Sequence, residues 1–394
     1  IGFIEKRIAH KVDSHFMKIV TEDHYLSIIE NRPKYKSSDS FNPNLPAQII
    51  FTSGSTGKPK GVVLSHKNLI SNTRSIIDYL HLSKDDTMEV VLPFFYCYGL
   101  SLLHTHLRVG GSIVLNNFFM CTGAVLNDIN KYKCTGFAGV PSHFQVLLRK
   151  SKSFKTTKFP SLRYVTQAGG KLHTSYIEEF IHAFPDILFY VMYGQTEATA
   201  RLSYLEPRKL KNKLGSIGKG IPKVKLKVVN HGGEQVKPGE TGEVIASGDN
   251  IMLGYYKDDA STKKHIRNGW LYTGDMGTID RDGYIYLSAR KKNIIKIGGK
   301  RISPMEIEAV IASHPDVVDC TVEAMEDEVA GEAIKAVVVP KRNIKNEISE
   351  SMLKSFCSGR LAQYKVPKVI QFSKNLKINS SGKKVKGNPK PMNV

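Results

Sequence analysis

The ten residues from Thr52 to Gly61, TSGSTGKPKG, suit the binding of a polyphosphate better than any other segment of the sequence. Three glycines let the backbone approach a ligand and expose its N–H groups, while four hydroxyl side chains and two lysines supply further donors. The spacing does not fit the Walker A pattern GxxxxGK[ST]. Because Gly- and Ser-rich loops are more often flexible connectors, the prediction depends on the rest of the sequence.

Two more segments carry charged groups that would suit the same ligand. The run Tyr193-Gly194-Gln195-Thr196-Glu197 ends in a carboxylate, which needs a cation such as Mg²⁺ between itself and a polyphosphate. Near the end, a Ser-Gly-Lys triplet carries a cation, Lys383. Taken singly, a surface acid and a solvated tail lysine are the commoner explanations.

The surrounding pattern predicts an α/β fold that would position these segments. Ile49 to Phe51 indicates a buried strand that leads into the Gly-rich loop, Gly61 to Leu64 a second strand, and a helix follows His66. Up to about residue 200, short apolar runs alternate with helical stretches such as 173–183, which is typical of α/β layering.

The second half of the chain changes character twice. From Val224 the run VKLKVV alternates with period two, and GEVIASG and YIYLSAR follow, which predicts a β-rich subdomain. After residue 290, Ser303-Pro304-Met305-Glu306 has the pattern of a capping box at the start of a helix. Strand-like runs at 317–324 and 333–339 and a helix near 350–361 complete a compact α+β unit.

Composition narrows the class of protein. The chain has 394 residues, of which 41% are hydrophobic and 24% charged, and no apolar run approaches the ~18 residues that span a bilayer. Five scattered cysteines predict reduced thiols and a cytoplasmic protein. The net charge of +21 is spread along the chain without arginine-rich arms, which argues against nucleic-acid binding.

Taken in order, these segments resemble the motifs of the adenylate-forming superfamily, which includes acyl- and aryl-CoA synthetases, adenylation domains of peptide synthetases and luciferases. The resemblance covers residues from about 45 to 390. It implies a large AMP-binding domain over residues 1–290, made of several sheets and the β-rich subdomain, and a small mobile α+β lid domain over residues 291–394. It also implies ATP, Mg²⁺ and a thiol acceptor, either coenzyme A or the phosphopantetheine of a carrier protein.

The resemblance assigns roles at the nucleotide. Tyr193 would lie along the adenine beside Gly194, Thr196 would contact the α-phosphate region, and Asp275 with Arg290 would bind the ribose hydroxyls. Glu197 would hold Mg²⁺, with Thr52 as a second candidate. The expected phosphate-binding residues are those of the Gly-rich loop: Thr52, Ser53, Gly54, Ser55, Thr56, Gly57 and Lys60.

The resemblance also assigns roles in the lid. Lys292 falls at the hinge, where the lid would rotate between an adenylating and a thioester-forming arrangement. In the second arrangement Lys296 and the Gly298-Gly299 loop would face the active site. Lys383 would serve the first step, with Lys384 as a rival; the sequence departs mildly from the family at Ala289, where Gly is usual.

The resemblance places the acid pocket at the segment VLPFFYCYGL, residues 91–100, and at the QAGG turn, residues 167–170. We expect Tyr96, Gly99, Gly170 and Gly194 to line it, with Gly169 and Gly170 beside the adenine as well. Tyr96 stands where relatives usually have His, and for Phe94 and Phe95 core packing is the better interpretation. No acidic residue lies between Val90 and Asn127, which argues against an amino acid as substrate because peptide-synthetase pockets use Asp there.

The resulting hypothesis is an AMP-forming ligase that adenylates a small carboxylic acid and passes the acyl group to coenzyme A. One alternative is loading of an acyl or aminoacyl group onto a carrier protein. Another is a truncated, non-catalytic nucleotide-binding protein, because the chain starts at Ile1 and has only 51 residues ahead of the Gly-rich loop. We therefore expect a fragment or a processed chain with a short N-terminal part.

Overall fold

The computed structural model describes residues 2–3, 19–20, 41–52, 59–116, 119–151, 153–290, 293–297, 300–327, 331–341 and 348–377. The chain divides into two units, residues 1–43 and residues 44–394. In the first, β1 (Gly2–Phe3) pairs in parallel with β2 (Ile19–Val20). All that follows concerns the second unit.

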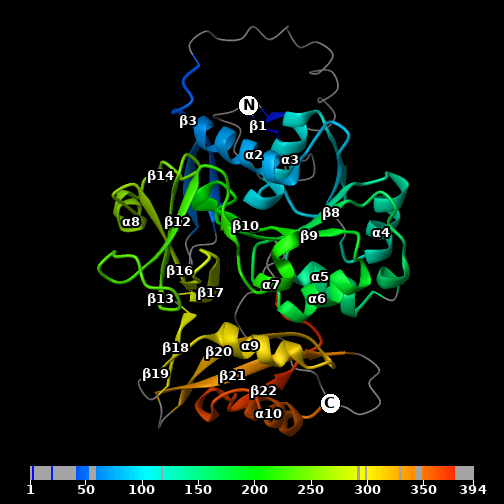
Figure 1. Cartoon of the computed structure of the whole chain (residues 1–394), viewed down its shortest axis with the longest axis vertical. Helices are drawn as coiled ribbons and strands as arrows, with labels where there is room; N and C mark the ends of the chain where they lie inside the picture. Colours follow the sequence, from blue (N-terminus) through cyan, green and yellow to red (C-terminus); the bar gives the residue numbers. More distant parts are fainter. Residues whose placement is uncertain are drawn as a thin grey trace. The chain divides into compact units, whose positions relative to one another are not determined.

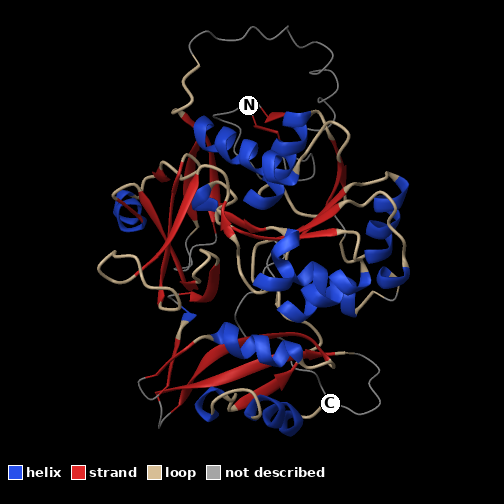
Figure 2. Cartoon of the chain, in the orientation of Figure 1, coloured by secondary structure: helices blue, strands red, loops and turns tan. Residues whose placement is uncertain are grey.

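The largest element is a seven-stranded sheet with the strand order β11-β10-β9-β8-β7-β5-β6 (Figures 1 and 2). Its parallel strands are β5 (Thr87–Val90), β6 (Ser112–Leu115), β7 (Gly136–Gly139), β8 (Tyr164–Gln167) and β9 (Leu188–Tyr193). The antiparallel edge is formed by β10 (Ser203–Leu205) and β11 (Lys219–Gly220). Such a sheet confirms the predicted α/β class.

Helices connect these strands. They are α2 (His66–Leu80), α3 (Cys97–Val109), α4 (Thr122–Lys131), α5 (Pro141–Arg149), α6 (Thr174–Ala183) and α7 (Leu210–Lys213). The predicted helix after His66 is confirmed as α2, where the amide of Asn68 donates to Ser65 Oγ (3.1 Å) and the amide of Ser65 donates to Asn68 Oδ1 (2.8 Å). Short 3₁₀ turns are η2 (Phe154–Thr156), η3 (Thr196–Ala198), η4 (Pro207–Lys209) and η6 (Gln363–Lys365). None of the helices in the described ranges is long and apolar enough to cross a membrane.

The two strands predicted around the Gly-rich loop belong to a separate three-stranded sheet, with the order β14-β4-β3. Its strands are β3 (Pro46–Thr52), β4 (Lys60–Ser65) and β14 (Gly254–Tyr255). The expectation of a buried first strand is wrong for two of its three residues, since Ile50 is 8% exposed but Ile49 is 41% and Phe51 66% exposed. Alternate side chains of a strand point to opposite faces, and only one face of β3 is covered.

The β-rich subdomain predicted from Val224 is confirmed as a five-stranded sheet. Its strands are β12 (Val224–Val229), β13 (Thr241–Gly248), β15 (Ile266–Arg267), β16 (Trp270–Ile279) and β17 (Ile285–Arg290). The helix α8 (Asp259–His265) precedes β15.

The C-terminal part contains the two helices and the two long strands that the sequence predicts, together with a hairpin and a third sheet strand that it does not. The strands are β18 (Ile295–Ile297), β19 (Lys300–Ile302), β20 (Val317–Asp327), β21 (Gly331–Pro340) and β22 (Val369–Phe372). The helices are α9 (Pro304–Ser313) and α10 (Glu350–Ser358), so the second ends before the predicted residue 361. The predicted capping box at Ser303 is wrong, because its hydroxyl donates to the carbonyl of Ser288 rather than capping α9.

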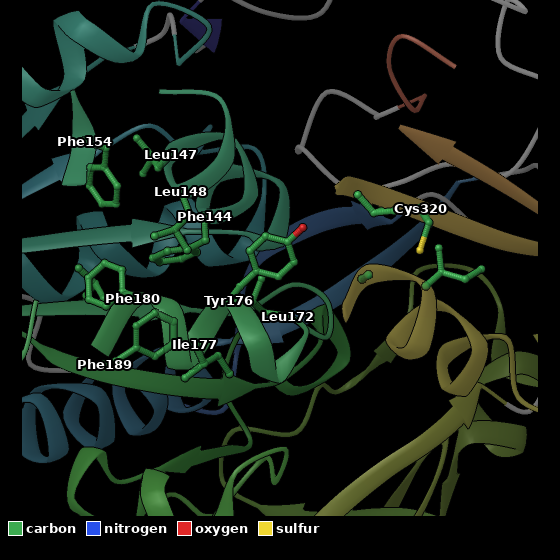
Figure 3. Packing of buried hydrophobic residues seen from close by; sticks show 14 of the residues in the cluster. Phe144, Leu147, Leu148, Phe154, Leu172, Tyr176, Ile177, Phe180, Phe189 and Cys320 are labelled. Atoms are coloured by element: carbon green, nitrogen blue, oxygen red, sulfur yellow. The ribbon is translucent and has the colours of Figure 1, made fainter. Parts of the chain in front are cut away.

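The main core packs α4, α5 and α6 against the large sheet and continues into the C-terminal part, and Figure 3 shows its aromatic centre. The rings of Phe144 and Phe189 lie 5.2 Å apart, and those of Phe180 and Phe189 5.1 Å. Tyr176 lies at the side of this cluster that faces β20, where its hydroxyl donates to the carbonyl of Val318.

Candidate functional site

Three residues predicted to bind the nucleotide meet at the end of β9. The hydroxyl of Tyr193 donates to Asp275 Oδ2 (2.7 Å), and Arg290 Nε donates to Asp275 Oδ1 (3.0 Å). Asp275 and Arg290 are opposite each other on β16 and β17, so the sheet register fixes this pair. The carboxyl ends of parallel strands are the usual ligand-binding edge of such sheets.

Arg290 balances the charge of Asp275, but the carboxylate oxygens of Asp275 can still accept further hydrogen bonds. The residue is 4% exposed, and its ion pair with Arg290 raises the pKa of the arginine. Burial raises the pKa of Tyr193, and the neighbouring Asp275 carboxylate adds to this effect. Each carboxylate oxygen can accept more than the one hydrogen bond described, so the pair can receive the two hydroxyls of a diol.

The turn after β9 brings the next predicted residues together. A Cβ at Gly194 would lie 2.0 Å from the carbonyl oxygen of Ala200, so only glycine allows this close backbone approach. Thr196 is 8% exposed, and its hydroxyl lies 3.5 Å from the sulfur of Cys97. Glu197 Oε1 accepts a hydrogen bond from the hydroxyl of Tyr255 (2.9 Å).

Lys60 joins this group through Tyr255. Its ammonium lies 5.1 Å from the centroid of the Tyr255 ring and pairs with Asp258 Oδ2 at 3.1 Å. Thr52 is opposite Lys60 in the β3–β4 register, and its hydroxyl donates to the Lys60 carbonyl (3.4 Å). Thr52 and Lys60 thus lie at the two ends of the Gly-rich loop, where it joins β3 and β4.

The predicted acid-pocket residues lie on two segments. Tyr96 is the N-cap of α3, and a Cβ at Gly99 would lie 2.3 Å from the carbonyl oxygen of Pro93. Gly169 has φ +85°, and the carbonyl of Gly170 accepts a hydrogen bond from Gln167 Nε2 (2.8 Å).

The two phenylalanines of the pocket segment differ. Phe94 packs against buried residues around β5 and α3, as expected. Core packing is wrong for Phe95, whose side chain is 63% exposed.

The predicted lid residues are less completely described. Lys296 lies on β18, its side chain is exposed, and its backbone amide donates to Glu332 Oε2 (2.5 Å). The remaining candidates fall outside the described residues; they are Ser53, Gly54, Ser55, Thr56, Gly57, Lys292, Gly298, Gly299 and Lys383, together with the rival Lys384.

The donors available to a cation suit Mg²⁺ better than a transition metal. No group of three or more His, Cys, Asp or Glu side chains is arranged for metal binding among the described residues. Mg²⁺ commonly takes one or two carboxylates and completes its shell with water and phosphate oxygens. Glu197, held by a neutral tyrosine hydroxyl, fits that requirement.

Sequence reasoning missed three residues of this region: Arg201, Tyr255 and Asp258. A period-two pattern cannot show that Tyr255, 58 residues from Glu197, carries the hydroxyl that reaches it. Arg201 follows Glu197 by four residues and would ordinarily be taken as solvated, yet it is 2% exposed. The only feature of the sequence that could have indicated this burial is the apolar composition around Arg201.

Comparison with known proteins identifies the family. The model of the AMP-binding enzyme family matches residues 5–256, and that of the AMP-binding enzyme C-terminal domain matches residues 306–383. Oxalate–CoA ligase of Arabidopsis thaliana is 33% identical over 87% of this chain and 66% of its own length. The 2-succinylbenzoate–CoA ligase of Bacillus licheniformis is 34% identical over 89% of this chain and 72% of its own.

Solved structures show the same fold. The o-succinylbenzoate CoA synthetase of Bacillus subtilis, in complex with its acyl-adenylate intermediate, aligns with a TM-score of 0.82 and 28% identity. That alignment covers 97% of this chain and 77% of the other. The anthranilate CoA ligase AuaEII in complex with anthranoyl-AMP gives a TM-score of 0.87 at 25% identity, covering 97% and 76%.

Relatives of this kind are longer than the chain, which spans 66% to 72% of the two ligases compared by sequence. Both family models, the sequence relatives and the fold indicate the same family. The chain belongs to the AMP-binding enzyme family, the adenylate-forming superfamily of acyl-CoA synthetase-like proteins.

Proposed function

We propose that this protein is an AMP-forming acid–CoA ligase that uses ATP and Mg²⁺. The observation that carries the proposal is the meeting of Tyr193, Asp275 and Arg290, which come from three strands and form a diol-accepting carboxylate beside an aromatic ring. The CoA ligases among the relatives support the choice of reaction.

In the first step, a carboxylate oxygen of the acid attacks the α-phosphorus of ATP and pyrophosphate leaves, which yields an acyl-adenylate. Asp275 accepts the ribose hydroxyls, Tyr193 lies along the adenine, and the 52–60 loop donates to the phosphates. Mg²⁺, held by Glu197 with Thr52 as a second candidate, neutralises phosphate charge when bound. Thr196 and Lys383 add donors at the α-phosphate, so catalysis consists of positioning and charge stabilisation.

In the second step, a thiol attacks the acyl carbonyl and AMP leaves. We assign this step to the lid, residues 291–394, which turns about Lys292 and brings Lys296 and the Gly298-Gly299 loop to the site. The larger domain then comprises residues 1–290. The exposed side chain of Lys296 supports a role that depends on such a movement.

Coenzyme A is the proposed acceptor. A carrier-protein phosphopantetheine is the second candidate, favoured by the nine basic and no acidic residues from Arg360 to the end of the chain. The acid is a small molecule bound near Tyr96, Gly99, Gly170 and Gly194, and nucleic acid is not a partner. None of the five cysteines, all of which lie in the described ranges, forms a disulfide, and this supports a cytoplasmic location.

The test is pyrophosphate release with Mg·ATP and hydroxylamine across short, medium, long and aromatic acids. Lys383→Ala should abolish release, while Lys384→Ala, its matched control, should leave it intact. Lys296→Ala should release pyrophosphate normally but fail to form the CoA thioester, with Lys300→Ala as control.

Each failure identifies a different error. Nucleotide binding without release for any acid would favour the non-catalytic alternative. Adenylation followed by transfer to a phosphopantetheinylated carrier protein and not to coenzyme A would favour the carrier alternative.

A further inference from the structure

Arg201 is a buried cation that no acid balances among the residues the structure describes. It is 2% exposed, and its Nε has no hydrogen-bond partner. Within the described ranges no carboxylate forms an ion pair with its guanidinium. Arginine cannot escape by losing its proton, so the charge persists in the folded protein.

The described groups that contact Arg201 are neutral. Its guanidinium lies 4.5 Å from the centroid of the Tyr98 ring and donates a hydrogen bond to the hydroxyl of Tyr79. Burial raises the pKa of Tyr79 to about 12 and raises that of Tyr98 further, so both phenols keep their protons. A cation–π contact and one neutral acceptor compensate a buried guanidinium only in part, because it has five N–H donors.

The backbone of Arg201 is also fixed, next to a residue of the predicted acid pocket. The carbonyl of Arg201 accepts from Asn72 Nδ2 (3.0 Å) and Asn250 Nδ2 (2.8 Å), which fixes the backbone. A Cβ at Gly194 would lie 2.9 Å from the Cα of Arg201, so the two segments touch. On the other side, Arg201 interacts electrostatically with Tyr96.

We propose that Arg201 is the anion-binding end of the acid pocket, so that the acid activated here carries a second anionic group, a dicarboxylic acid being the simplest case. This inference rests on the proposed function and names its substrate class. A planar guanidinium can bind a carboxylate through two parallel hydrogen bonds, which would satisfy the free Nε and balance the charge. The pocket segment from Val90 to Asn127 contains no acidic residue that could take this role in place of a ligand.

A purely structural role for Arg201 predicts different behaviour. An arginine kept as a packing element would be stabilising, and its loss would weaken the fold and affect all acids equally. An unbalanced buried charge is instead destabilising, so replacement by an apolar side chain of similar length should stabilise the protein without ligand.

The experiment compares the wild-type chain with Arg201→Met, Arg201→Lys and a control, Arg163→Met. Arg163 also stacks on a tyrosine, Tyr164 at 4.8 Å, but has a carboxylate partner in Asp86 (2.8 Å). Pyrophosphate release is measured with straight-chain dicarboxylates of two to eight carbons and benzene dicarboxylates, each beside the monocarboxylate of equal size. Melting temperature is measured with and without each acid, in the presence of Mg²⁺ and a non-hydrolysable ATP analogue.

The wild type should prefer at least one dicarboxylate to its matched monocarboxylate. Arg201→Met should lower that preference, as a ratio of kcat/KM values, by about 100-fold or more, because the second carboxylate loses a charged bidentate partner. Arg201→Lys should retain part of it, and Arg163→Met should leave the ratio unchanged. Without acid, Arg201→Met should melt at a higher temperature than the wild type, and Arg163→Met at a lower one.

Three results would overturn the inference: no dicarboxylate preferred by the wild type, an unchanged ratio in Arg201→Met, or a lower melting temperature with an equal loss for all acids. If Arg201→Met does not fold, an unchanged ratio in Arg201→Lys has the same meaning. Monocarboxylate turnover without any dicarboxylate preference would refute the inference and leave the ligase function standing. Conversely, a dicarboxylate that stabilises the wild type but not Arg201→Met, with no pyrophosphate released, would uphold the inference and refute the ligase function.

Discussion

Tyr96 interacts electrostatically with two arginines, Arg290 and Arg201, which differ in both burial and pairing. Arg290 has a carboxylate partner in Asp275, at 3.0 Å, although 62% of its own side chain is exposed. Arg201 is buried almost completely and, within the described ranges, has no carboxylate partner. Buried charged residues are usually paired and exposed ones often are not, so these two arginines show the opposite of the usual relation.

The difference indicates two kinds of recognition. At the Asp275 end, the protein supplies both charges, so the ligand needs only hydroxyl groups and its binding should depend little on its own charge. At the Arg201 end, the protein supplies one charge, so the ligand must supply the other. Four substitutions can break or sharpen this comparison.

Asp275→Ala should have the largest effect, because it removes the acceptor oxygens and also leaves Tyr193 and Arg290 without their partner. We expect ATP affinity, measured by calorimetry, to fall by about 100-fold or more. Asp280→Ala is the matched control, since Asp280 follows the same strand and pairs with Lys213 (2.7 Å) away from this cluster. A loss below tenfold would mean that the paired end of the comparison does not bind the nucleotide.

Glu89→Gln tests a buried acid that, unlike an arginine, can lose its charge by binding a proton. Glu89 is 0% exposed, and burial, with help from Asp128, raises its pKa from 4.5 to about 8. The folded state therefore binds this proton more tightly than the unfolded state, so stability falls as pH rises from about 4.5 to about 8 and then levels.

Urea unfolding should therefore show Glu89→Gln to be the more stable protein by about 2 kcal/mol or more at pH 8.5, with the advantage shrinking toward pH 5. Glu178→Gln, on the exposed face of α6, should show neither effect. Unlike Glu89, Arg201 has no such proton to exchange, so Arg201→Met should shift stability equally at both pH values. A pH-independent difference for Glu89→Gln would show that the carboxyl is ionised throughout.

Arg290→Met removes the cation from the paired end. We expect ATP affinity to fall by about tenfold and the free energy of unfolding by about 1 kcal/mol, the latter limited by the exposure of the arginine. Arg267→Met is the control, because Arg267 stacks on Tyr272 at 4.5 Å and is exposed. The comparison fails if Arg290→Met stabilises the protein as Arg201→Met is expected to do.

Tyr255→Phe should have the smallest effect and tests an acid held by a neutral donor. Loss of the hydroxyl that donates to Glu197 should lower kcat/KM by about three- to tenfold at limiting Mg²⁺, and excess Mg²⁺ should restore most of it. Tyr256→Phe, at the neighbouring exposed position, should behave as the wild type. An effect that Mg²⁺ does not reverse would separate Glu197 from the metal.

Much of the fold could be predicted from the sequence, because apolar periodicity and turn residues are local signals. The helix after His66, the strands around the Gly-rich loop and the β-rich subdomain were predicted in this way. The exposure of Ile49, Phe51 and Phe95 could not be, since a side chain's cover comes from segments distant in the chain. The failed capping box at Ser303 has the same origin, because the competing carbonyl of Ser288 belongs to another strand.

In the candidate site, too, residues in local motifs could be predicted, and residues that act through contacts between distant segments could not. Tyr193, Asp275 and Arg290 were predicted from motifs, and the structure brings these three together. Tyr255 and Asp258 were missed because they act through contacts with Glu197 and Lys60 that sequence spacing does not show. Arg201 was missed because its burial without a carboxylate partner, among the described residues, depends on the tertiary structure and cannot be read from the sequence.

The exposed face of β3 has a consequence for the protein in solution. Ile49 and Phe51 present apolar side chains on a strand that pairs, in the described part of the chain, with β4 alone. Such an edge invites association with a second copy, and a net charge of +21 opposes it by mutual repulsion. Because salt screens that repulsion and leaves the apolar attraction intact, these molecules should stay dispersed in dilute buffer and gather as ionic strength rises.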